Sequence, residues 1–291
     1  MNLQNKSWKL SVLLTLALVL AAICADAQST SHPATKKTAK APTPVVAETV
    51  VPTLESKAVE ILKATSDRLK AAHTVAFTAV ETFESADRFG QPIVFANRSE
   101  VTLQRPDKLR VIMSADGPPS EFYYDGKAMM AYAPAENLLA IADAPPTIDQ
   151  ALEAAYHSAA IYFPFTDLIV ADPYNDLAPG LKLAYYIGQS QVVGGTTTDM
   201  VAYSGDGVFA QIWIGTQDKL PRVVHAVYLD DPAQLRHNLL FSDWQLDAAV
   251  TAESFAPANA VNAKRIQFAH PNPEPVPGAM PSLKGQTESS R

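Results

Sequence analysis

The sequence predicts an α+β fold in which one large, curved antiparallel β-sheet forms an unclosed half-barrel, with a helical lid over an apolar cavity. Short segments of alternating apolar and polar residues recur, separated by tight-turn signals such as Asp125-Gly126, Gly194-Gly195 and Asp206-Gly207. Helical periodicity is confined to one segment before the first strand and to an insertion in the middle of the chain. A sheet of about ten strands has to curl because strand twist accumulates, and a curled sheet has a concave face that helices can cover.

The first helix is expected to begin at Leu54, with Thr53 as its cap, and to end near His73, because apolar residues recur at helical spacing. Strands are predicted next at 74–84, 92–106, 107–115, 123–134 (a hairpin) and 136–142. On the first of them, Phe77 shares a face with Val75.

The hairpin YYDGKAMMAYAP (123–134) is apolar on both faces of its second strand, where Ala128, Met130 and Tyr132 alternate with Met129, Ala131 and Ala133. A hairpin at the surface would carry polar residues on one face. We therefore expect one face to line a hollow and the other to pack on a neighbouring layer or under a helix.

The middle insertion predicts a helix that Thr147 caps, with Leu152 and Tyr156 at helical spacing, and Pro164 ends this pattern. A second short helix is expected around 166–171. Strands are then predicted at 181–193, 196–205, 208–215, 220–230 and 236–246.

The N-terminus has the layout of a secretory signal peptide over residues 1–27: Lys6 and Lys9, an uncharged apolar run, and small residues at 25–27. An uncleaved anchor helix is the alternative. Lipidation at Cys24 is disfavoured because the bulky Ile23 precedes it. Cleavage after residue 27 leaves a mature chain without cysteine, which excludes disulfides and thiolate chemistry. The expected location is the periplasm, across the inner membrane of a Gram-negative bacterium.

Composition divides the remaining chain into a flexible Pro/Thr/Lys spacer (28–52), one domain (53–270) and a disordered Pro-rich tail (271–291). Four acidic and seven basic residues lie outside the domain, so the domain holds 26 acidic and 16 basic residues. A domain with this negative balance is a poor nucleic-acid binder, and we expect no nucleic-acid partner.

Motifs for catalysis or cofactor binding are missing from the sequence. The glycines of GDGVFA (205–210) precede a strand rather than the helix that a dinucleotide fingerprint requires. His225 has no cysteine, histidine or carboxylate at metal-ligand spacing, and it is interpreted as a buried barrel histidine. Ser190 and Ser204 are the only nucleophiles loosely compatible with His225, and their spacing supports no triad. We expect no cofactor, no metal and no enzymatic activity.

Two segments, VTLQRPDKLRVIM (101–113) and YYDGKAMMAYAPAENLLAI (123–141), resemble the periplasmic lipoprotein carriers of the LolA/LolB-like fold. Segments 203–231, 239–247 and 254–260 resemble still more closely a family of predicted periplasmic proteins of unknown function. The resemblance implies a half-barrel whose cavity takes acyl chains. It also implies cavity positions at Leu109, Val111 and Met113, a lid formed by the first helix and 147–176, and a latch at Arg105.

Together, the residues and the resemblance predict a monomeric carrier that holds a lipid or an acylated protein without chemistry. The predicted cavity residues are Phe77, Leu109, Val111, Met113, Met130 and Tyr132, and the predicted lid residues are Leu152 and Tyr156. One alternative is an envelope interaction or stress-sensor module with a vestigial cavity, in which an edge or the tail binds a protein partner. A less favoured alternative is an acyl hydrolase.

Overall fold

The computed structural model describes residues 53–269, so the expectations about the signal peptide, Cys24, the spacer and the tail concern residues outside this range. The helices are α1 (Ser56–Ala71), α2 (Ile148–Ala159), α3 (Thr166–Ile169) and α4 (Pro173–Leu177), with short 3₁₀ turns η1 (Ala178–Gly180) and η2 (Ala252–Phe255). The strands before the insertion are β1 (Thr74–Ala86), β2 (Pro92–Gln104), β3 (Lys108–Ala115), β4 (Ser120–Tyr124), β5 (Ala128–Ala133) and β6 (Leu138–Asp143). Those after it are β7 (Leu181–Ser190), β8 (Thr198–Gly205), β9 (Val208–Gly215), β10 (Pro221–Tyr228), β11 (Arg236–Leu246) and β12 (Lys264–Ile266).

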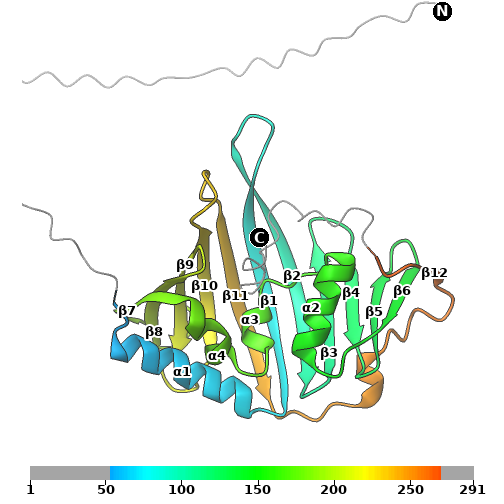
Figure 1. The fold of residues 1–291 in the computed structure, drawn as a ribbon, viewed down its shortest axis with the longest axis horizontal. Helices are drawn as coiled ribbons and strands as arrows, with labels where there is room; N and C mark the ends of the chain where they lie inside the picture. The colour runs from blue at the N-terminus through cyan, green and yellow to red at the C-terminus, as the bar shows by residue number, and fades with distance from the viewer. Residues whose placement is uncertain (1–52, 270–291) are drawn as a thin grey trace, which may run out of the picture. The chain divides into compact units, whose positions relative to one another are not determined.

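All these strands form one twelve-stranded sheet in the order β12-β6-β5-β4-β3-β2-β1-β11-β10-β9-β8-β7 (Figure 1). Two antiparallel meanders, β1–β6 and β7–β11, join where β1 pairs with β11 at the centre. Only β12 runs parallel to its neighbour, β6. The two end strands, β7 and β12, do not pair with each other, so the predicted unclosed α+β half-barrel is confirmed.

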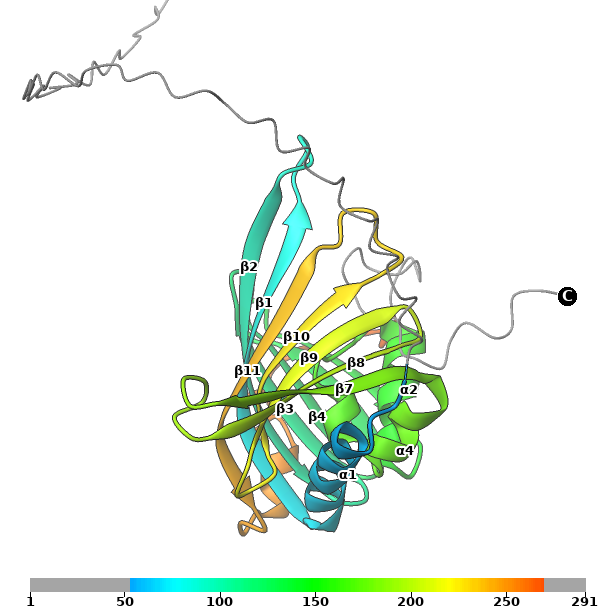
Figure 2. The ribbon, with the colours of Figure 1, turned by 90° about the vertical axis from the view of Figure 1, so that its left-hand side faces the viewer.

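The sheet curves around the helices, which lie together on its concave side (Figures 1 and 2). Cross-strand pairing explains which side chains face them. Phe77 lies opposite Val101, Val101 opposite Val111, and Val111 opposite Phe122, so these four share one face. They are buried in the main core together with residues of α2 and of the segment that contains α3.

Strand β5 is apolar on both faces because both faces are covered. Met129 and Ala131 face the main core on the concave side. Met130 and Tyr132 face a second cluster on the outer side, where Ala260, from the segment after η2, packs against them. The prediction that one face lines the interior and the other meets a neighbouring layer therefore fits, and the covering layer is the C-terminal segment rather than a helix.

The start of the first helix differs from the expectation. Thr53 is not the cap: α1 begins at Ser56, after Glu55, and residues 53–55 precede the helix. Their backbone extends the edge of β7, since the Ala184 amide donates to the Thr53 carbonyl (3.0 Å) and the Glu55 amide donates to the Ala184 carbonyl (2.8 Å). These two bonds satisfy backbone groups of residues 53–55 in an extended conformation, so the helix begins later than predicted.

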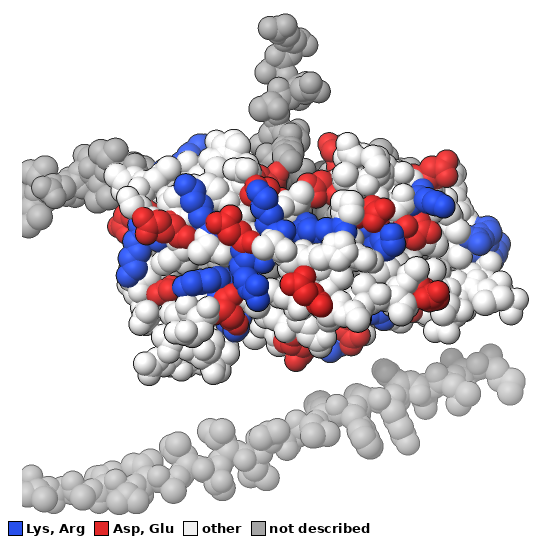
Figure 3. All heavy atoms as spheres, turned by 90° about the horizontal axis from the view of Figure 1, so that it is seen from below, with Lys and Arg blue, Asp and Glu red and all other residues white. Residues whose placement is uncertain are grey.

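Charged side chains of both signs are interspersed on the face seen from below, which carries no extended basic area (Figure 3). Between residues 53 and 269, no helix is long and apolar enough to cross a membrane.

Candidate ligand-binding site

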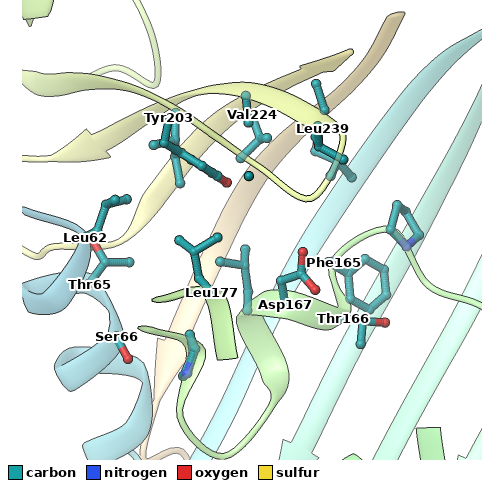
Figure 4. Close-up of a pocket in the computed structure, with 18 of the residues that line it drawn as sticks. Leu62, Thr65, Ser66, Phe165, Thr166, Asp167, Leu177, Tyr203, Val224 and Leu239 are labelled. Atoms are coloured by element: carbon teal, nitrogen blue, oxygen red, sulfur yellow. The ribbon is translucent and has the colours of Figure 1, made fainter. Parts of the chain in front are cut away.

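A hollow of about 130 Å³ lies between the helices and the concave face of the second meander (Figure 4). On one side, α1 contributes Leu62 and Thr65, and the segment of α3 and α4 contributes Phe165 and Leu177. The sheet side is formed by residues of β8 to β11: Tyr203, Ala210, Ile212, Val224, Tyr228, Leu239 and Phe241. The walls are therefore mostly apolar carbon, which suits a hydrocarbon ligand.

The hollow exists because the core of this sheet is divided. One cluster lies under α2 and α3 on β1–β5 and β11, whereas a second lies under α1 on β7–β9. Val224, near the middle of β10, packs against both clusters. A sheet this wide and curved is not filled by short helices, so space is left between the two packed regions.

Few polar groups reach into this space. Figure 4 shows the Tyr203 hydroxyl and the Asp167 carboxylate turned toward the gap between the sheet and the helices. Burial raises the pKa of Tyr203, and Asp167 raises it further, so the phenol stays protonated at neutral pH.

The insertion is fixed to the rest of the fold by a few hydrogen bonds. Arg105, in the β2–β3 turn, donates from Nη1 to the Ile169 carbonyl at the end of α3 (3.2 Å). On the other side, Asp172 accepts from Ser66 (3.2 Å) and pairs with Lys70, both on α1. The insertion thus contacts the β2–β3 turn at one end of α3 and helix α1 just before α4.

Arg105 is poorly satisfied for a buried cation. Its Nε and Nη2 atoms are buried and have no hydrogen-bond partner among residues 53–269. Burial lowers the pKa of Arg105, whereas the nearby Asp149 raises it. The bond from Nη1 to the Ile169 carbonyl ties this guanidinium to the insertion, and a latch role for Arg105 stays a prediction.

Among the other hollows that border the insertion, two contain predicted site residues. One, of about 360 Å³, is lined by Val111, Met113 and Phe122 of the first meander. The other, of about 220 Å³, is lined by Leu152 and Tyr156 of α2. Tyr162 lines both of these and also the first hollow, so its ring stands at their junction.

The predicted site residues divide into three groups. Val111 and Met113 line the hollow of the first meander, and Leu152 and Tyr156 line the one beside α2. Phe77 and Leu109 face the same side but are packed into the main core. Met130 and Tyr132 pack in the outer cluster, because Met129 and not Met130 points to the concave face; Tyr132 also borders the 360 Å³ hollow.

The hollow between α1 and β8–β11 was not predicted from the sequence. Its sheet residues alternate along β10 and β11, as Val224, Ala226 and Tyr228 or Leu239 and Phe241, and this alternation is visible in the sequence. Nothing local, however, indicates that α1 crosses this part of the sheet.

The candidate catalytic residues do not meet. His225 is exposed on the outer face of β10, which corrects the interpretation of a buried histidine, and its ring contacts Asn238. Ser204 lies on β8, with β9 between the two strands, so two strand spacings of about 4.8 Å separate their backbones. Ser204 donates to the Val208 carbonyl (3.0 Å). Within the described range, no group of His, Cys, Asp or Glu is arranged to hold a metal ion.

A family model described as "Predicted periplasmic protein (DUF2092)" matches residues 58–269, nearly the whole described range. The chain belongs to this family. The resemblance to a family of predicted periplasmic proteins is thereby confirmed, as is the periplasmic location at the level of the family. No curated protein matches the sequence of this DUF2092 protein.

Three solved structures that are similar to this DUF2092 protein share 10–14% sequence identity with it. A complex of MucA and MucB from Pseudomonas aeruginosa matches at 14% identity and TM-score 0.42, over 72% of this chain and 64% of that chain. An uncharacterized conserved protein from Thermus thermophilus matches at 14% identity and TM-score 0.41, over 72% of this chain and 99% of that chain. A LolA superfamily protein from Nitrosomonas europaea matches at 10% identity and TM-score 0.31, over 69% of this chain and 97% of that chain.

Proposed function

We propose that this protein is a periplasmic carrier that holds the hydrocarbon chain of a lipid or of an acylated protein under its helical lid, without a chemical step. The observation that supports this proposal is the apolar hollow between α1, the α3–α4 segment and strands β8–β11. Each methylene group moved from water into such a space contributes roughly 0.8 kcal/mol. Burial of about ten methylenes therefore supplies the free energy of micromolar binding, about 8 kcal/mol.

The polar contacts of the lid support the same proposal. Arg105 attaches the insertion to the β2–β3 turn of the sheet, and Asp172 attaches it to helix α1. Opening the hollow breaks these bonds and separates Phe165 and Ile169 from the main core, but it leaves the β-ladder in place. Exchange of a ligand then requires movement of the lid alone.

Purification from the native periplasm followed by native mass spectrometry and organic extraction tests the proposal. A bound lipid or acyl-peptide mass is the expected result, and it also identifies the class of ligand. A ligand-free mass, together with no binding of a neutral fluorescent apolar probe, would contradict the carrier function.

A second candidate, an envelope interaction module, is favoured by one specific observation. The β1–β2 hairpin projects beyond the rest of the sheet (Figures 1 and 2) and exposes Phe89, Ile93, Val94 and Phe95 near its tip. Phe89 is 71% exposed, which is unusual for a phenylalanine that serves only packing. A ligand-free protein that nevertheless loses an envelope partner on Phe89→Ser would support this function over the carrier.

A further inference from the structure

Three polar side chains gather on the concave face where β1, β10 and β11 run side by side. They are Glu81, Tyr228 and His237, and we call them the polar cluster. His237 is 5% exposed, and its Nδ1 atom lies 4.0 Å from Oε1 of Glu81. Its ring meets the Tyr228 ring edge-on, with centroids 5.1 Å apart. The cluster is therefore a fixed arrangement in a nearly dry environment.

Two atoms of the polar cluster lack a partner. Nδ1 of His237 and the Tyr228 hydroxyl are buried and make no hydrogen bond to any residue in the described range. Glu81 accepts a hydrogen bond at Oε2 from the Asn97 side chain, at 3.1 Å, whereas its Oε1 faces His237. A buried polar atom without a hydrogen bond is costly, so two of them on neighbouring rings of one cluster point to a ligand that completes the arrangement.

The polar cluster is continuous with the hollow under the lid. Tyr228 itself lines the hollow. His237 lies two residues from Leu239 on the same face of β11, and it pairs across to Ala226 of β10; both of these neighbours line the hollow. A ligand whose chain occupies the apolar part can therefore place its head among the three side chains.

The charged groups around the cluster are acidic. Glu81 and Asp167 both act on Tyr228 and on Tyr162, raising the pKa of each phenol in addition to the larger effect of burial. Asp231, in the turn between β10 and β11, interacts with His237. The potential here disfavours a carboxylate or phosphate head and favours a cation.

We propose that Glu81, Tyr228 and His237 form a subsite for the primary ammonium head of an amphiphile whose chain lies in the hollow. Three N–H groups of one ammonium match three acceptors: the Glu81 carboxylate, the Tyr228 oxygen, and Nδ1 of His237 when this nitrogen carries no proton. This inference rests on the carrier function proposed above and specifies its ligand as an amine-bearing lipid or lipid-like molecule.

Four probes test the subsite below their aggregation concentrations: dodecylammonium, dodecanol, dodecanoate and butylammonium. Displacement of a neutral fluorescent apolar probe reports each affinity. Because a charge-assisted hydrogen bond contributes about 1.5–3 kcal/mol, dodecylammonium is expected to bind at least about tenfold more tightly than dodecanol. Dodecanoate is expected to bind more weakly than dodecanol, and butylammonium not to bind detectably.

Glu81→Gln is the decisive variant, and Glu84→Gln is its matched control on the outer face of the same strand. Glu81→Gln is expected to reduce the preference for the amine to under about threefold while leaving dodecanol affinity unchanged, since only the charge-assisted bond is lost. Glu84→Gln should behave as the wild type. Tyr228→Phe keeps the ring but removes the hydroxyl, so it should reduce the preference for dodecylammonium over dodecanol in part. It serves as a second test of the subsite if Glu81→Gln unfolds.

The outcomes separate this inference from the carrier function. If dodecanol binds but the amine is not preferred, or if Glu81→Gln weakens all ligands equally, the subsite is refuted and the carrier stands. If none of the dodecyl compounds binds, the carrier function fails as well. If butylammonium binds as tightly as dodecylammonium, the cluster is a site for a small free cation and the proposed amphiphile is wrong.

Discussion

Substitution of Val224 by phenylalanine tests the hollow most directly. Val224 projects from β10 into the hollow and packs against both core clusters (Figure 4). The larger side chain adds four carbon atoms between these clusters, inside a hollow of only about 130 Å³. These four carbon atoms would displace a similar number of methylenes of a bound hydrocarbon chain from the hollow.

The magnitude follows from the transfer free energy of the displaced methylenes. If about three to four methylenes leave the hollow, the loss is about 2–3 kcal/mol at roughly 0.8 kcal/mol each. That loss corresponds to about 30- to 150-fold weaker binding. Titration of dodecanol against a neutral fluorescent apolar probe measures this change, and thermal unfolding checks that the variant is folded.

Val223→Phe is the matched control because Val223 is the neighbouring residue of β10 and points to the outer face, where it pairs with Leu240. It adds the same ring outside the hollow and should leave affinity within about twofold of wild type, since no methylene of the ligand is displaced. Wild-type affinity in a folded Val224→Phe protein would refute the assignment of the hollow as the ligand site.

Three other substitutions have defined outcomes. Arg105→Leu removes the donor to the Ile169 carbonyl, so the backbone amides of α3 should exchange hydrogen faster and the ligand should dissociate faster. Arg110→Leu, on the outer face, is the control and should change neither rate. Equal ligand retention in both variants would show that Arg105 is no latch. Ala160→Gly should raise the free energy of unfolding by about 1 kcal/mol, because Ala160 caps α2 at φ 53°; a lowered denaturant midpoint would contradict this. Tyr124→Phe should lower it by about 1–2 kcal/mol, because the fully buried hydroxyl donates to the Pro145 carbonyl at 2.6 Å; an unchanged midpoint would mean that the bond contributes little.

The fold was predictable because its signals are local. Alternation and turn residues define the strands one by one, and the Asp-Gly and Gly-Gly pairs define antiparallel neighbours. The pairing of β1 with β11 is not local: Val75 of β1 lies opposite Leu246 of β11, far along the chain, and no period or turn links them. No single segment of the sequence therefore predicts that the two meanders join into one sheet. The prediction depends on the family resemblance and on the curvature expected of so wide a sheet.

The site was predictable only in part, because successive side chains of a strand point to opposite faces of the sheet. An error of one position therefore moves a residue to the wrong face. Val111 and Met113 follow Leu109 at alternate positions of β3 and therefore share its face, and the resemblance implied that this face lines the cavity. Met130 was predicted to line the cavity from its position after the Asp125-Gly126 turn in the resemblance, yet cross-strand pairing sets Met129 opposite the buried Tyr124 and thereby turns Met130 outward. In an all-apolar strand, hydrophobicity cannot correct such an error, since both faces satisfy the pattern equally.

The construction of the lid indicates how the hollow can open. Helices α3 and α4 contain four and five residues, too few to be stable alone, so their conformation depends on the contacts that they make. Those contacts attach one end of α3 to Arg105 and the start of α4 to Ser66 and Lys70 of α1. Loss of either attachment removes one polar contact of this segment, whereas Phe165 and Ile169 still hold it to the main core and α2 keeps its own cap and core residues. Opening would therefore be a local event whose free energy includes both these polar bonds and the apolar contacts of Phe163, Phe165 and Ile169 with the main core. In the proposed carrier, a local opening of this kind lets the protein retain its ligand when closed and release it when open.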